Sequence, residues 1–338
     1  MSLAPAISAT LGNLRYDVQA MHCSASLALL PRGSSARLRL PAAVRFEAQS
    51  GDDASLDLDG GEGARTVLTG QLRSVRRGVL EIEVELGDAA SLLAAYRPAC
   101  SFEKQSAKQI IRKLAGDVSV DPGDLDIDLD LPAYIAHPGR TAAEHVAELA
   151  RLGGALAQAD ADGRLQVRAL PDGPADAALR FGRKITHYEV RSVPVAHGQS
   201  FAIGAGPAGS ASAPDALRPS TGFLPADAAD GGPDVMRWPT PLLRTPKAAS
   251  AASSALSRQA ASRAQQLHAR CFLLPALRPG QVIEVQDLPD GLAGGPWLVI
   301  RVEHEVSHGA GRTSFVAQSA AAPSLLGGLA GAAQGALA

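Results

Sequence analysis

The stretch from Leu80 to Leu86 alternates apolar residues with glutamates without a break. Because successive side chains of a strand point to opposite faces, this pattern predicts a β-strand with one face in a core and a carboxylate face in water. Residues 24–30 and 37–40 also predict strands, and Gly-containing turns separate these segments. Several short strands at regular spacing predict a small barrel or sandwich over residues 1–95.

The next part of the chain changes period and predicts helices. Two pairs have the capping-box spacing, Ser106 with Gln109 and Thr141 with Glu144. Each pair predicts the start of a helix, because the two side chains satisfy backbone groups that a first helical turn leaves free. Asp126–Leu131 alternates and predicts a short strand with an exposed carboxylate face. We therefore expect an α/β unit over residues 96–175.

The remaining chain returns to strand patterns, with a long interruption. Strands are predicted at 185–190, 201–203, 282–285, 297–302 and 313–316. Residues 204–246 lack periodicity and predict an irregular insertion, and an Ala- and Ser-rich segment predicts one helix over about 247–270. We expect a second β unit over residues 176–322, followed by an apolar Gly/Ala tail over 323–338. The predicted fold class is α+β, mainly β.

Composition excludes several classes of protein. The 338 residues carry a formal net charge of −2 with no basic patch, which argues against nucleic-acid recognition. No apolar run reaches the roughly 20 residues that span a bilayer, so we expect no membrane anchor. The N-terminal residues do not resemble a signal peptide, so we expect synthesis in the cytoplasm. The three scattered cysteines fit free buried thiols better than a disulfide framework.

Residues His304–His308 match the zinc motif H-E-x-x-H. That motif binds zinc on a helix, where the two histidines share one face. The preceding residues alternate as in a strand, and on a strand two residues four apart are separated by roughly 13 Å. Glu305 would also point away from any metal that His304 and His308 held. We therefore predict no metal site here.

Residues Gly204–Gly209 match the dinucleotide pattern G-x-G-x-x-G. The pattern binds a pyrophosphate only where a helix starts inside it. Pro207 removes a backbone donor, Pro214 follows, and no helical periodicity appears nearby. A loop is therefore the better interpretation. A nucleotide-binding protein that uses these residues remains an alternative hypothesis. We predict no catalytic residue, no cofactor and no metal.

The order of five segments resembles one known family. These segments are Val67–Leu72 followed by the strand at 80–86, Phe102–Ala115, Gly139–Ala155, Leu277–Val282 and Trp297–His304. The family comprises the baseplate-hub proteins of contractile tails, often called phage late-control D proteins, which are related to the hub part of VgrG in type VI secretion. Each segment is weak alone, and the similarity covers roughly residues 10–320 in order.

The resemblance implies two small β-barrels with an α/β insert, assembled as a homotrimer. In this family six barrels form a pseudo-sixfold ring that adapts the sixfold tail tube to a threefold spike. The implied partners are the tail tube protein, other baseplate proteins and a spike that is a separate polypeptide, since no β-helical repeat follows here. The implied location is a phage tail, a tailocin or a related injection particle.

Two questions stay open at this stage. The alternative function is a tail-associated hydrolase, either zinc-dependent at His304 and His308 or degrading cell walls. The apolar tail, with Leu325, Leu326 and Leu329, is a candidate docking segment for a partner such as the spike, and a tail without a partner is the alternative.

Overall fold

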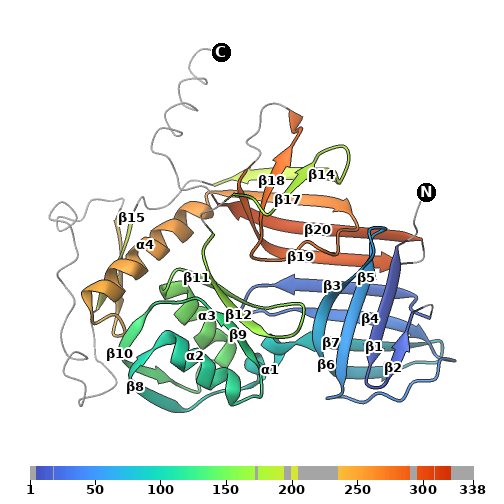
Figure 1. The fold of residues 1–338 in the computed structure, drawn as a ribbon, viewed down its shortest axis with the longest axis horizontal. Coiled ribbons are helices and arrows are strands. Elements are labelled where there is room, and N and C mark those ends of the chain that lie inside the picture. The colour runs from blue at the N-terminus through green and yellow to red at the C-terminus, as the bar shows by residue number, and fades with distance from the viewer. Residues whose placement is uncertain are drawn as a thin grey trace.

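The alternating stretch forms strand β7 (Glu81–Asp88), as predicted. Its apolar residues Ile82, Val84 and Leu86 are 3% exposed or less, and their neighbours face outward. The computed structural model describes residues 5–17, 19–171, 174–193, 199–204, 235–289, 295–307 and 309–320. Strands dominate these residues, so the predicted class, α+β and mainly β, is confirmed (Figure 1).

Seven strands form the N-terminal β region. They are β1 (Ala6–Leu11), β2 (Leu14–Tyr16), β3 (His22–Ala28), β4 (Ser35–Pro41), β5 (Asp53–Asp59), β6 (Ala64–Arg77) and β7. The C-terminal β region contains β13 (Ala177–Arg180), β14 (Ile185–Ser192), β17 (Gln265–Phe272), β18 (Val282–Gln286), β19 (Trp297–Ser307) and β20 (Ala310–Ser319). Both regions belong to one 13-stranded sheet.

The sheet is not closed into two separate barrels. Its strand order is β14-β17-β20-β19-β3-β4-β7-β6-β5-β1-β2, with β13 and β18 attached beside β19. The ladder between β19 and β3 joins the two regions and runs from Arg301 opposite Ala28 to Ser307 opposite His22. β19 can make this second ladder because it is 11 residues long and antiparallel to both β20 and β3.

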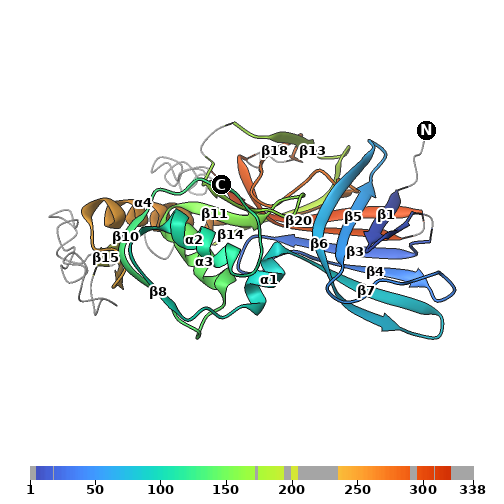
Figure 2. The same cartoon turned by 60° about the horizontal axis from the view of Figure 1, so that its bottom comes forward.

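A helical unit lies beside this sheet along the long axis of the molecule (Figure 2). Its helices are α1 (Ala89–Ala95), α2 (Ala107–Gly116), α3 (Ala142–Leu152) and α4 (Pro246–Ser262). Its strands form three small sheets: β8 (Cys100–Ser106) with β10 (Asp130–Ala136); β9 (Pro122–Leu125), β11 (Ala155–Ala159) and β12 (Leu165–Ala169); and β15 (Gln199–Gly204) with β16 (Val235–Thr240).

Two hydrophobic cores correspond to these parts. One core packs residues of both β regions together, including Leu56, Leu38, Val302 and Phe315. The other core packs the four helices against the small sheets, with Ile110, Val146, Leu165 and Ala252 at its centre. The two β regions therefore share a single core, while the helical unit has its own.

Both predicted capping boxes are confirmed. The Ser106 hydroxyl accepts a bond from the Gln109 N–H, and the Gln109 side chain accepts one from the Ser106 N–H. Thr141 and Glu144 make the same reciprocal pair at the start of α3. The Glu144 carboxylate accepts the Thr141 N–H at 2.7 Å, and these bonds lower the pKa of Glu144.

The helix predicted over about 247–270 is wrong at its C-terminal end. Helix α4 ends at Ser262, and β17 begins at Gln265. Leu267 fits a helical stripe, but Leu267, Ala269 and Cys271 are buried in alternation with exposed residues. Burial that alternates with a period of two is typical of a strand, and this strand pairs with β14 and β20.

The insertion predicted at 204–246 is only partly irregular where the structure describes it. Residues 205–234 lie outside the described part, but Val235–Thr240 forms β16, parallel to β15, and Pro246 starts α4. A parallel strand pair joins segments that are distant in sequence, so no local pattern indicated it.

The strand predicted at Asp126–Leu131 is also wrong for most of its length. Residues 126–129 lie between β9 and β10 and belong to no strand, although the Asp126 N–H still donates to the Val167 carbonyl of β12. Ile127 and Leu129 are nevertheless buried while the intervening aspartates face water. The alternation therefore predicted correctly which side chains are buried, but it did not show whether the backbone pairs with a neighbouring strand.

The capping box of α3 makes a testable prediction. Substituting Thr141→Ala removes the acceptor for the Glu144 N–H, and we expect it to lower the free energy of unfolding by about 1 kcal/mol. Thr141→Ser keeps the hydroxyl and should stay close to the wild type. Urea denaturation of the three proteins measures the difference, and equal stability of the alanine and serine variants would contradict the assigned cap.

Candidate assembly surfaces

His304 lies on a strand, as the argument against a zinc site expected. Its ring points into the core from β19 and is 1% exposed, whereas Glu305 faces the other side of the strand and pairs with Arg312. His308 lies outside the described residues. Within the described ranges no cluster of three or more His, Cys, Asp or Glu side chains is arranged to hold a metal ion.

Burial keeps His304 in its uncharged form. The Thr313 hydroxyl accepts a bond from the Leu274 N–H at 2.8 Å, so its own proton is free to go to Nδ1 of His304, 2.9 Å away. Burial, together with the positive charge of Arg278, lowers the pKa of His304 to about 4. His304 is therefore a neutral core residue at physiological pH.

Arg278 ties the loop between β17 and β18 to the N-terminal β region. Its guanidinium donates to the backbone oxygens of Thr66 (2.6 Å) and Val67 (3.0 Å) in β6. Burial lowers the pKa of this group. The segment Leu277–Val282 resembles the hub family, but nothing in its sequence pattern indicated this contact.

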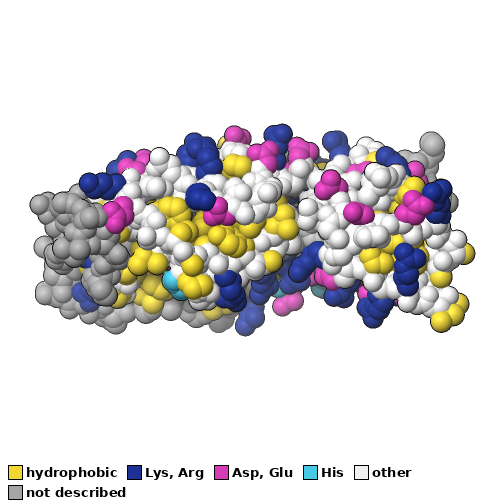
Figure 3. All heavy atoms as spheres, turned by 90° about the horizontal axis from the view of Figure 1, so that it is seen from below, with side chains coloured by type: hydrophobic (Ala, Val, Ile, Leu, Met, Phe, Trp, Pro, Cys, Tyr) yellow, Lys and Arg dark blue, Asp and Glu magenta, His cyan; other side chains and the backbone are white. Residues whose placement is uncertain are grey.

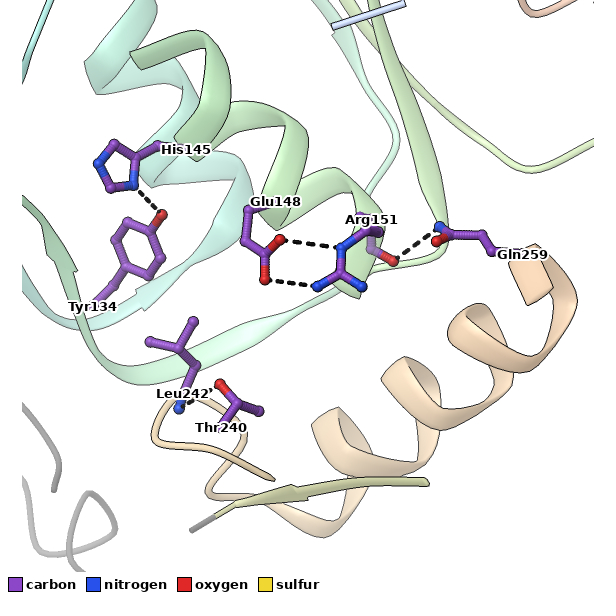
Figure 4. Close-up of polar contacts among 7 residues, drawn as sticks. All are labelled: Tyr134, His145, Glu148, Arg151, Thr240, Leu242 and Gln259. Atoms are coloured by element: carbon purple, nitrogen blue, oxygen red, sulfur yellow. Dashed lines mark hydrogen bonds and ion pairs between the residues drawn. The ribbon is translucent and has the colours of Figure 1, made fainter. Parts of the chain in front are cut away.

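Tyr134 and His145 form a second buried polar pair, between β10 and α3 (Figure 4). The Tyr134 hydroxyl donates to Nδ1 of His145 at 2.7 Å, and Nε2 of His145 donates to the His137 carbonyl at 3.1 Å. Burial lowers the pKa of His145 and raises the pKa of Tyr134. Both groups are thus held uncharged, which suits a structural contact rather than proton transfer at neutral pH. The sequence analysis missed this pair because the two residues are brought together only by packing.

A groove of about 480 Å³ lies where the helical unit meets the sheet. Its walls come from the loop after β3, from α3 and β11, from α4, and from β19 and β20. Ile300 lines it at a β-bulge, since the β19–β20 register shifts between Val299 and Arg301. A bulge re-aims the extra side chain, and here it turns Ile300 toward the groove.

The opposite walls of this groove are braced by polar contacts. Glu148 and Arg151 of α3 form a bidentate ion pair with bonds of 2.8 and 3.1 Å (Figure 4). Gln259 of α4 donates to the Arg151 carbonyl, and the Arg151 guanidinium also stacks on Trp238 of β16 at 5.6 Å. These contacts hold α4 and β16 against α3.

A second depression, of about 420 Å³, lies on the outer face of the sheet. Charged side chains of both signs line it, among them Glu189, Arg270, Arg301 and Glu303, together with His187 and His268. Ion pairs continue across the neighbouring strands, with Arg39 and Arg76 contacting Glu83 and Arg312 contacting Glu305. Such a mixed surface fits a protein partner better than a polyanion.

Apolar side chains are exposed at several places on the surface. Val79 and Leu80, at the tip of the β6–β7 hairpin, are 94% and 83% exposed, and Phe272 at the end of β17 is 61% exposed. Hydrophobic side chains also gather near the middle of the face seen in Figure 3, with charged side chains of both signs around them. Adjacent exposed apolar residues are typical of protein contact surfaces.

The remaining candidate residues from the sequence lie outside the part of the chain that the structure describes, apart from Gly204. Leu325, Leu326 and Leu329 lie outside the described residues, and so do residues 205–209 of the glycine motif, of which only Gly204 is described, at the end of β15. No helix in the described part of the chain is long and apolar enough to cross a membrane.

Comparison with known proteins adds evidence at the level of the fold. No protein-family model and no curated protein matches the sequence. A tail protein from Neisseria meningitidis MC58 superposes with a TM-score of 0.70 at 15% identity, over 94% of this chain and 97% of that one. The 43 kDa tail protein of prophage MuSo2 from Shewanella oneidensis gives 0.68 at 14% identity, over 94% and 99%. The fold is that of tail proteins.

A third similar structure comes from a secretion system. A component of the type VI secretion system of E. coli, described as structurally similar to the T4 bacteriophage tail proteins gp27 and gp5, superposes with a TM-score of 0.63 at 12% identity. The match covers 94% of this chain and 79% of that one. The shared tail-protein fold therefore spans nearly the whole chain and occurs in phage and secretion-system proteins alike.

The buried state of His304 predicts a dependence of stability on pH. Between pH 6.5, the ordinary pKa, and about 4, the unfolded chain binds a proton that the buried ring does not. The free energy of unfolding should therefore fall as the pH is lowered through this range. From pH 7 to pH 4 the wild type should lose about 3 kcal/mol more than His304→Gln.

Urea denaturation at several pH values measures this difference. The comparison between the two proteins isolates His304, because Asp88, whose pKa burial raises to about 6, titrates in the same way in both. Parallel pH profiles for the wild type and the variant would contradict a neutral, buried His304.

Proposed function

We propose that this chain is a structural baseplate hub of a contractile phage tail, a tailocin or a related injection system. The observation that carries the proposal is the likeness to tail proteins over 94% of the chain, including both β regions and the helical unit between them. The segments that resemble the late-control D and VgrG hub family occur in the same order along the chain. One line of support rests on residues and the other on backbone geometry.

The architecture is compatible with an adaptor between sixfold and threefold parts. Each chain brings an N-terminal and a C-terminal β region that are rigidly joined through β3 and β19. Three chains would therefore present six β regions around one axis. The proposed partners are two further copies of the chain, the tail tube protein, a separate spike and other baseplate proteins, within an assembled tail particle.

A mechanical role needs no reactive polar groups, and the polar groups in the described residues are consistent with such a role. Burial keeps the two buried histidines uncharged by lowering their pKa values, and the exposed ion pairs lie on open strand faces. We propose a function in assembly rather than catalysis. Bound interfaces would transmit the movement of the contracting sheath to the tube and spike.

The proposed assembly predicts the mass of the protein in solution. We expect a stable trimer, with three times the 34.7 kDa mass of the chain, in light scattering coupled to gel filtration. The mass should persist on dilution to micromolar concentration, because a hub must hold together without its neighbours. A monomer at all concentrations would count against the hub.

The hydrolase alternative makes a different prediction. A zinc enzyme at His304 and His308 would carry stoichiometric zinc that is lost on His304→Ala. We expect elemental analysis of the purified protein to find no stoichiometric zinc, since the His304 ring is buried and bonded to Thr313. Stoichiometric zinc in the wild type, absent from the variant, would overturn the assembly role.

A further inference from the structure

We propose that the groove between the helical unit and the sheet is the seat of this chain's own C-terminal segment, residues 321–338, with Leu325, Leu326 and Leu329 as its apolar contacts. The inference does not depend on the hub function, because it concerns two parts of one chain. It differs from docking of the tail onto a spike, which would leave the groove open.

The groove offers an apolar surface that folding leaves partly uncovered. Leu29, Ala147, Leu156 and Ile300 all line it, and each keeps part of its side chain exposed. These residues come from three separate elements and the loop after β3, so the surface is a property of the folded chain. Covering it would remove apolar area from water, which is the main favourable contribution in such contacts.

The segment is chemically matched to this site. Residues 321–338 contain four leucines and no charged side chain. Of the charged groups that line the groove, Glu148 and Arg151 are paired with each other, Glu144 is bonded at the start of α3, and Arg140 and Arg263 are exposed to water. An uncharged segment can therefore enter without leaving a buried ion unpaired, which would be costly.

The described chain also ends beside the groove. Gln318, near the end of β20, is one of its lining residues, and the Ala320 N–H donates to the Pro296 carbonyl at 2.9 Å. Leu325 follows Gln318 by seven positions, so it reaches at most about 23 Å from it at about 3.3 Å per residue. A tether this short gives a high effective concentration, so a modest apolar contact is enough for occupancy within one chain.

A disulfide trap tests the contact and distinguishes one chain from two. The trap places cysteines at the groove and in the tail, Ala147→Cys and Ser324→Cys, in a Cys100→Ser background. Cys23 and Cys271 are buried free thiols, and burial raises their pKa values to about 12, so they should not compete. The matched control moves the first cysteine to Ala95→Cys, an exposed position on α1 that does not line the groove.

We expect mild oxidation to give an intramolecular disulfide in the groove pair, with a yield about tenfold above the control. Adding Leu325→Ser and Leu326→Ser should abolish that excess, because it removes the apolar contacts and leaves both thiols in place. A disulfide between two chains would show that the groove receives a second copy and would overturn the proposal. A yield equal to the control, in protein with wild-type stability, would overturn it as well.

Discussion

The ladder between β3 and β19 is the contact on which the rest of the structure depends. It joins strands that lie near opposite ends of the sequence, from Arg301 opposite Ala28 to Ser307 opposite His22. Without it the two β regions would be separate sheets with two exposed edges, which are prone to wrong pairing. With it they share a single core, and the residues that follow β3, beginning at Leu29, come to lie beside Ile300. One ladder thus creates both the elongated sheet and the groove at its junction with the helices.

Buried polar groups strengthen the same junction. Arg278 reaches across to the backbone of β6, and its charge disfavours protonation of His304, which is bonded to Thr313 of β20. Nδ1 of His304 is paired with the Thr313 hydroxyl, while its buried Nε2 has no hydrogen-bond partner among the described residues. The arrangement fits a part that transmits force, because it links strands of both β regions through side chains as well as through the sheet. It also explains why His304 is a core residue.

Sequence patterns predicted those features that depend only on residues close together in the chain. The glutamate alternation at 80–86 and the capping boxes at Ser106 and Thr141 were predicted correctly, because each depends on residues within one element. The boundary between α4 and β17 was missed because Leu267 satisfies both periods and only the partner strands select one. The β15–β16 pair, the β3–β19 ladder, the Tyr134–His145 contact and the groove all join distant segments. A single sequence carries no local signal for such contacts.

The functional account rests on how the chain's two β regions are arranged when several copies assemble. Electron-microscopy class averages of the purified protein test this most directly. The account predicts a closed ring with a central channel, threefold in symmetry and with six similar lobes, two from each chain. Averages showing isolated single chains, or a closed assembly without threefold symmetry, would contradict it.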